Sequence, residues 1–176
     1  HLTVLIWGFT AILGRSIDLP AVTLVWYRIA IVVVTRAAVI AWRRLGFVHP
    51  WKVVRPWLGV GVLVALHWLC FYGCIKYAGI AVAVLCLSLV SFFTALLEPW
   101  VFRRASLPAE WLIGGLVVVG VSLLVKVEAR ADALGLALGL GSAFFGAAFG
   151  TLNGRFALTA RAELVTHYEQ VAALGA

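Results

Sequence analysis

The chain has 176 residues, of which 64% are hydrophobic and 12% charged, and its formal net charge is +7 at pH 7. A soluble domain carries about twice this share of charged residues, so the composition excludes an ordinary water-soluble fold. The basic residues stand in short clusters between long apolar runs, which is typical of membrane proteins and argues against a nucleic-acid partner. We therefore predict an all-α, polytopic transmembrane helix bundle that is surrounded by a lipid bilayer.

Apolar segments follow one another along the chain. A membrane span needs roughly 20 mostly apolar residues, and five runs approach that length: 20–42, 57–76, 79–102, 109–126 and 133–156. Residues 2–15 predict a shortened first helix, and residues 163–176 predict the first half of a seventh. Because almost no loop separates the third run from the fourth, we expect these two to form a tight antiparallel hairpin. The chain starts at His1, contains no Met and stops within an apolar run, so we expect a fragment of a longer protein.

The lysines and arginines predict the orientation. Counted over alternate loops, one side holds eight of them and the other side four: Arg43, Arg44, Lys52, Arg55, Arg103, Arg104, Arg155 and Arg161 against Arg15, Lys76, Lys126 and Arg130. Basic loops favour the cytoplasm. We therefore expect a multi-pass protein of the plasma membrane, as in a bacterial inner membrane, with a cytoplasmic N-terminus.

A weak internal repeat occurs at a spacing near 140 residues. The segment 9–15 aligns with 149–155, and residues 22–28 resemble 165–169 once a gap is allowed. Five helices per repeat would give two copies of opposite topology, which is typical of secondary transporters with a substrate site between the copies. Chance similarity in a sequence rich in Gly and Ala is the alternative.

Several stretches in this order resemble the drug/metabolite transporter superfamily, and within it the EamA-type transporters. They are Trp7-Gly-Phe, Leu24-Val-Trp-Tyr-Arg28, the segment from Tyr77 to Leu85, Ala95-Leu-Leu-Glu98, Gly114 to Val121 and Gly135 to Ala143. The resemblance implies ten helices in two inverted five-helix repeats, with residues 1–126 as the first repeat and 133–176 as the truncated start of the second. One departure is the fourth helix, where the family often has a central proline and this chain has Leu89-Val-Ser-Phe, with Pro99 after Glu98.

Ionisable residues within the spans are candidates for substrate binding, because each costs about 2.5–3.5 kcal/mol to insert. Arg28 lies roughly 12 Å from the end of its helix and could bind a carboxylate or tie two helices together. Glu169 is its counterpart in the repeat and could take up a proton or pair with Arg28. His67 and Tyr168 are further candidates for contacts with the substrate.

Arg36 and Glu98 lie at a similar depth near the predicted cytoplasmic ends of their helices. We interpret them as a gating or structural salt bridge. The glycines Gly114, Gly120, Gly135, Gly139, Gly146, Gly150 and Gly154, with Ala143, recur on helix faces, and we expect close helix packing there.

A different class of function is a membrane-embedded redox or metal-binding protein. His67, Cys70 and Cys74 share one helix face and could bind a thiophilic metal, although cysteine is also a small apolar residue that simply packs. A membrane scaffold without transport activity is a third reading. We expect no metal site and no cofactor.

The preferred prediction is a secondary transporter, not an enzyme. It would carry a small-molecule substrate, such as an amino acid or an amphipathic amine, by alternating access at a midplane cavity. The sequence contains no ATP-binding P-loop, so a solute gradient, exchange or a proton would drive transport. The sequence does not decide whether the protein forms a homodimer.

Overall fold

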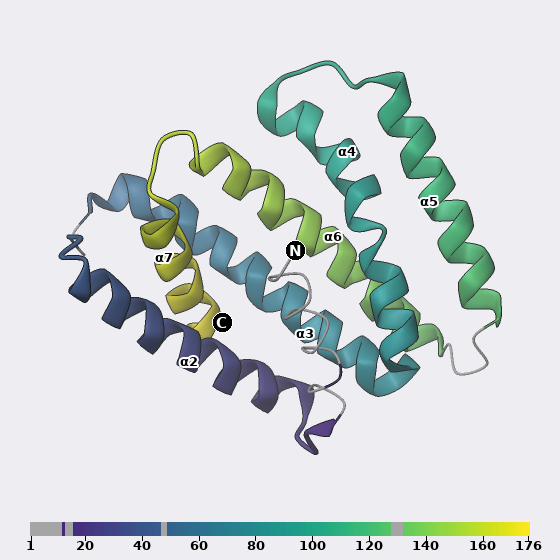
Figure 1. Cartoon of the computed structure of the whole chain (residues 1–176), viewed down its shortest axis with the longest axis horizontal. Helices are drawn as coiled ribbons and strands as arrows, with labels where there is room; N and C mark the ends of the chain where they lie inside the picture. Colours follow the sequence, from purple (N-terminus) through teal and green to yellow (C-terminus); the bar gives the residue numbers. More distant parts are fainter. Residues whose placement is uncertain (1–11, 13–15, 47–48, 128–131) are drawn as a thin grey trace.

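The computed structural model describes residues 12, 16–46, 49–127 and 132–176, and it gives side-chain environments for these except 124–127. Six helices occur in this part of the chain (Figure 1): α2 (Ala21–Trp42), α3 (Trp51–Leu87), α4 (Val90–Phe102), α5 (Pro108–Val127), α6 (Ala133–Phe156) and α7 (Ala162–Gly175). The described residues contain no strand. The predicted all-α bundle is therefore confirmed, while the predicted helix 2–15 and its part of the repeat lie almost wholly outside the described residues.

The helices have the length and surface of membrane spans. Helices α2, α3 and α6 are long and apolar enough to cross a bilayer, and α4 and α5 are shorter apolar helices. Large apolar side chains are exposed along α5, among them Leu112, Leu116 and Leu123. In water such a stripe would be costly, whereas in a bilayer lipid tails cover it.

Helix α3 is two helices joined at Gly79. Its 37 residues would make a straight helix about 55 Å long, far more than the roughly 30 Å hydrocarbon core. Gly79 has φ 90° and ψ 170°, a conformation that residues with a Cβ rarely adopt. Cys74 and Cys86, on either side of Gly79 in the chain, both lie against Gly139 of α6. The chain therefore folds back at Gly79, which is the predicted hairpin.

The predicted spans 57–76 and 79–102 consequently differ from the helix bounds. The second half of α3 and α4 together form the fourth span, interrupted at Ser88 and Leu89, whose N–H groups bond three residues back to Leu85 and Cys86. Helix α3 also begins at Trp51, before the predicted span. The first turns of the helix, which contain Lys52 and Arg55, extend beyond the apolar run. Bilayer thickness sets the length of the apolar run but not the length of the helix outside it.

Helices α3 and α6 lie side by side at the centre of the bundle (Figure 1). Small residues of α6 permit this approach. A Cβ on Gly135 would lie 2.5 Å from the Cβ of Ala78, and one on Gly139 would lie 2.6 Å from the Sγ of Cys86. Gly150, by contrast, has open space where its Cβ would be. The prediction of close packing therefore holds at Gly135 and Gly139 but not at Gly150.

The remaining glycines of that prediction behave differently from one another. A Cβ on Gly114 would lie 2.9 Å from the ring of Phe92, whereas one on Gly120 would meet open space. A Cβ on Gly154 would make ordinary contact with Phe102 at 3.4 Å. Of these three, Gly114 is therefore the one at which α5 approaches its neighbour closely.

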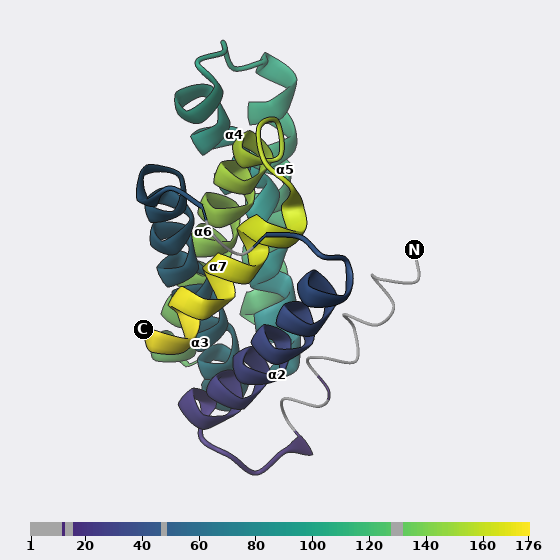
Figure 2. The ribbon, with the colours of Figure 1, turned by 90° about the vertical axis from the view of Figure 1, so that its left-hand side faces the viewer.

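Helix α7 packs against α3 and α2 and brings the C-terminal end of the chain beside α2 (Figures 1 and 2). Gly61 of α3 makes this contact possible, because a Cβ there would overlap the carbonyl oxygen of Glu169 and the Cβ of Ala172. Gly61 thus sets how closely α7 approaches α3. It also sets the position of the Glu169 side chain between them.

Candidate functional site

A cavity of about 590 Å³ opens between α3, α4, α6 and α7. This volume falls within the range that small-molecule sites usually have. Its walls are mainly apolar and aromatic, with a few polar groups. The lining residues are Val64, His67, Trp68, Phe71, Leu87, Val90, Gly146, Phe149, Asn153, Thr166, Glu169 and Gln170.

Glu169 supplies the acidic group of the cavity. Its side chain is 1% exposed, and its Oε2 accepts a hydrogen bond of 3.1 Å from the Asn153 Nδ2. Since a carboxylate accepts and an amide nitrogen donates, this bond fixes the orientation of the Asn153 amide. Among the described residues, neither the Glu169 Oε1 nor the Asn153 Oδ1 has a hydrogen-bond partner. The cavity therefore has two buried acceptor atoms that receive no hydrogen bond from the described residues.

His67, on α3, also lines the cavity and is held by α6. Its Nδ1 is 2.8 Å from the Ser142 carbonyl oxygen and 3.2 Å from the Ser142 Oγ. Because a carbonyl oxygen only accepts, the Nδ1 carries the proton. In the neutral ring the Nε2 is then an acceptor. The sequence prediction that His67 lines a cavity agrees with this placement, and its role in binding stays a prediction.

Aromatic rings surround His67. The centroid of its ring lies 5.0 Å from that of Trp68 and 5.3 Å from that of Phe149, and Phe71 stands 5.9 Å from Trp68. Such rings offer an apolar surface and the negative faces that attract cations.

Arg28 lies near the cavity but does not line it. Its Cζ is 3.8 Å from the centroid of the Trp68 ring, and its Nη1 donates a 2.9 Å hydrogen bond to the Tyr72 hydroxyl. The structure thus does not bring Arg28 and Glu169 together as an ion pair, since Glu169 pairs with Asn153. In this geometry Arg28 positions Trp68 and ties α2 to α3.

We expect Arg28→Ala to lower the free energy of unfolding by about 1–3 kcal/mol, because it removes the contact with Trp68 and the bond to Tyr72. Tyr72→Phe removes only the hydrogen bond and should cost less. Thermal unfolding of both variants in detergent measures the difference. Equal losses in the two variants would show that the stacking on Trp68 contributes nothing.

Tyr168 lies apart from the cavity. Its ring centroid is 5.7 Å from that of Trp57 and 6.3 Å from that of His49. It packs with Val54, Trp57 and Val165. Although Tyr168 is next to Glu169 in the sequence, the helical turn of about 100° per residue points it to another side of α7. It does not line the cavity, and its predicted contact with substrate remains untested.

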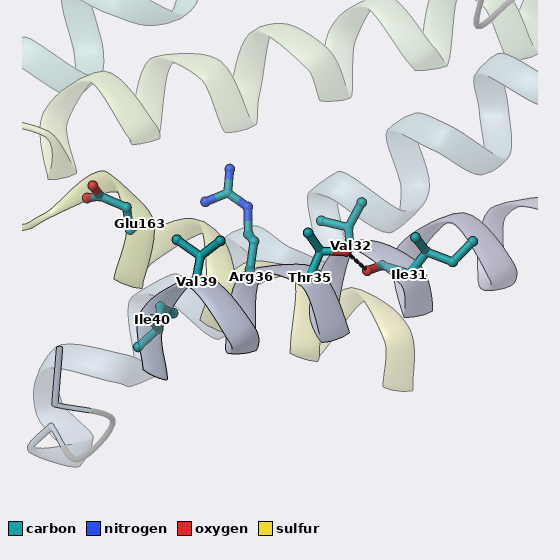
Figure 3. Close-up of a pocket in the computed structure, with 7 residues that line it drawn as sticks. All are labelled: Ile31, Val32, Thr35, Arg36, Val39, Ile40 and Glu163. Atoms are coloured by element: carbon teal, nitrogen blue, oxygen red, sulfur yellow. Dashed lines mark hydrogen bonds between the residues drawn. The ribbon is translucent and has the colours of Figure 1, made fainter. Parts of the chain in front are cut away.

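Arg36 and Glu98 are also separated. Arg36 lines a second pocket of about 420 Å³ between α2 and α7, together with Thr35 and Glu163 (Figure 3). Within the described residues Arg36 has no ion pair, whereas Arg43, one residue beyond the end of α2, forms a 2.9 Å ion pair with Glu163.

Glu98 belongs to a cluster at the turn between α4 and α5. The Arg104 Nη2 lies 2.5 Å from the Glu98 Oε2 and 2.6 Å from the Glu110 Oε1. Hydrogen bonds to Glu110 and Glu98 hold the pKa of the Arg104 guanidinium above its usual value. The structure therefore pairs Glu98 with Arg104 and not with Arg36, and it places Glu98 in a tie between two consecutive helices.

The three residues of the alternative metal site, His67, Cys70 and Cys74, contact different residues of α6. Cys74 meets Gly139, a Cβ on Gly141 would lie 3.4 Å from the Sγ of Cys70, and His67 bonds Ser142. In the described part of the chain, no group of three or more His, Cys, Asp or Glu residues is placed to hold a metal ion. All three cysteines are free thiols.

Asn153 was not among the predicted site residues, although it donates a side-chain hydrogen bond to Glu169 within the described structure. An amide within an apolar run was the available signal. An uncharged amide lacks the high insertion cost that marks an ionisable residue as a candidate. Ser142, which holds His67, was missed for the same reason.

Apolar helices of membrane-spanning length define a multi-pass membrane protein, and its partly polar cavity has the volume of a small-molecule site. A model of the EamA-like transporter family matches residues 1–126, and the chain belongs to this family. It is accordingly a membrane transporter of the drug/metabolite type, as the sequence motifs indicated. Comparisons with curated proteins and with solved structures found no match. The family match ends within α5, so the α6 and α7 walls of the cavity lie beyond it.

Proposed function

We propose that the protein is a secondary carrier of small organic solutes and that the cavity between α3, α4, α6 and α7 is its substrate site. The proposal rests on which helices form the walls of the cavity. Helices α3 and α4 belong to the first proposed repeat (1–126), whereas α6 and α7 belong to the second (133–176). Rocking of one repeat against the other would open such a cavity to either side in turn.

The ion pair between Arg43 and Glu163 would form part of a cytoplasmic gate. It joins α2 to α7, which are helices of the two proposed repeats, at the side that the basic residues assign to the cytoplasm. Both side chains are partly exposed, at 54% and 38%. An exposed pair contributes about 0–1 kcal/mol. Breaking it would therefore hinder opening only slightly, as an alternating gate requires.

The test is transport by the protein that carries this chain, at its natural length, in liposomes. A panel of labelled amino acids, amines and neutral metabolites would be offered, and counterflow would be measured with each solute on the opposite side. A carrier shows saturable uptake that the solute inside accelerates. Uptake that rises linearly with concentration for every solute, equal to that of empty liposomes, would overturn the proposal.

A pair of α6 variants locates the site. Gly146 lines the cavity, so Gly146→Leu should fill it and reduce saturable uptake at least roughly tenfold. Gly150→Leu makes the same change on the same helix where a Cβ would meet open space, and it should transport like the wild type. Both proteins must first elute as folded species. If both variants transport normally, the substrate site lies elsewhere.

A further inference from the structure

The cavity contains no cationic side chain among its lining residues, and this bears on what it can bind. Its acidic residue is Glu169. Arg28 is engaged with Trp68 and Tyr72. Arg36 acts on Glu169 by its charge but belongs to the separate pocket between α2 and α7. Among the described lining residues, an anionic ligand would meet no cationic side chain, and an ionised Glu169 would repel it.

The cavity has polar atoms of both kinds, but two of its buried acceptors lack a donor in the described residues. They are the Glu169 Oε1 and the Asn153 Oδ1. The Thr166 hydroxyl already donates to the Ala162 carbonyl at 2.8 Å. Donors on the lining residues are the indole N–H of Trp68, the second amide N–H of Asn153 and the amide N–H groups of Gln170, whose amide oxygen also accepts. Buried acceptors without donors are costly, so a ligand rich in N–H groups would be favoured.

The rest of the cavity suits an apolar body. Trp68, Phe71 and Phe149 provide aromatic faces, and Val64, Leu87 and Val90 provide aliphatic surface. Aromatic faces attract ammonium groups as well as apolar ones. The two requirements, N–H donors carrying a positive charge and an apolar body, are met together by one class of molecule.

We propose that this cavity binds primary organic ammonium ions with an aromatic or aliphatic body, with Glu169 as the charge partner and Asn153 as a second acceptor. The inference rests on the proposed carrier function and narrows it to one class of solute. Two of the three N–H bonds of a primary ammonium would serve the two acceptors that lack donors. A carboxylate would place a second negative charge beside Glu169. A zwitterionic amino acid would carry that same carboxylate into a cavity whose described lining residues include no cation.

Four probes of nearly equal size test this with the natural-length protein in liposomes: 2-phenylethylammonium, its N,N,N-trimethyl derivative, 2-phenylethanol and 3-phenylpropionate. Uptake is measured as above, and binding is measured in detergent by the shift in unfolding temperature. We expect the primary ammonium to bind at least roughly tenfold more tightly than the alcohol or the carboxylate. The trimethyl compound keeps the charge but offers no N–H group, so it should fall between the primary ammonium and the alcohol.

The two measurements separate the two proposals. Selective binding and uptake of the primary ammonium supports both. Selective binding without uptake supports the ligand class and overturns the carrier. Uptake that favours the carboxylate or the alcohol overturns the ligand class and leaves the carrier standing. If the trimethyl compound equals the primary ammonium, the N–H donors do not matter and the proposal fails in that part.

Discussion

Replacing Glu169 by Gln is expected to weaken binding of 2-phenylethylammonium roughly 10–100-fold and to abolish its saturable uptake. The change removes the negative charge but keeps the size of the side chain and an oxygen that can accept from Asn153. A hydrogen bond to a charged group contributes about 1.5–3 kcal/mol, and each 1.4 kcal/mol is a factor of ten in affinity. Since the side chain is 1% exposed, water does not replace what is lost.

The matched control is Glu110→Gln, which removes a carboxylate from the turn between α4 and α5. Glu110 bonds Arg104 and does not line the cavity, so this variant should bind and transport like the wild type. Both proteins are first compared for thermal unfolding without ligand. If Glu169→Gln retains full affinity, or if Glu110→Gln loses as much, the assignment of Glu169 as charge partner is wrong.

The Glu169→Gln variant also tests how binding depends on pH. A proton and an ammonium ion compete for one carboxylate, so acidification should weaken ammonium binding by the wild type. Glu169 is faced by Arg36 from α2 and Asn153 from α6. His67 from α3 lines the same cavity, and His167 lies on the same helix as Glu169. Either histidine could also change charge with pH. If Glu169→Gln removes the pH dependence, the carboxylate causes it, whereas a dependence that persists points to a histidine.

Replacing Gly135 by Ala is expected to destabilise the bundle, against the usual effect of this substitution in a helix. Ala is favoured over Gly by about 1 kcal/mol in helix propensity. At Gly135, however, the new Cβ would lie 2.5 Å from the Cβ and 2.9 Å from the backbone nitrogen of Ala78. A backbone atom cannot move aside as a flexible side chain can. Overpacking of this kind costs about 1–3 kcal/mol, so we expect a net loss.

Gly150→Ala provides the comparison on the same helix, because open space surrounds its new Cβ. It should leave the unfolding temperature unchanged or raise it. Thermal unfolding in detergent, followed by circular dichroism, measures both variants. A Gly135→Ala protein as stable as Gly150→Ala would mean that α3 and α6 are not held at the close distance that Gly135 permits.

The sequence by itself determined the class of structure and most helix bounds. Bilayer thickness requires a long apolar run for each span, and the apolar run 133–156 coincides with α6 (Ala133–Phe156), as 20–42 does closely with α2 (Ala21–Trp42). The hairpin at Gly79 also followed, because two spans without a loop between them must fold back. These properties depend on segment length and composition, which can be read directly from the sequence.

Only the tertiary structure decided which side chains meet. Arg28 and Glu169 are counterparts in the proposed repeat, yet Arg28 stacks on Trp68 and Glu169 bonds Asn153. Glu98 pairs with Arg104, close to it in sequence, and not with Arg36. The depth of a residue in the membrane can be counted from the sequence. Its partner depends on how each helix is rotated and how closely its neighbour approaches, and contacts such as that of Gly61 with α7 set both.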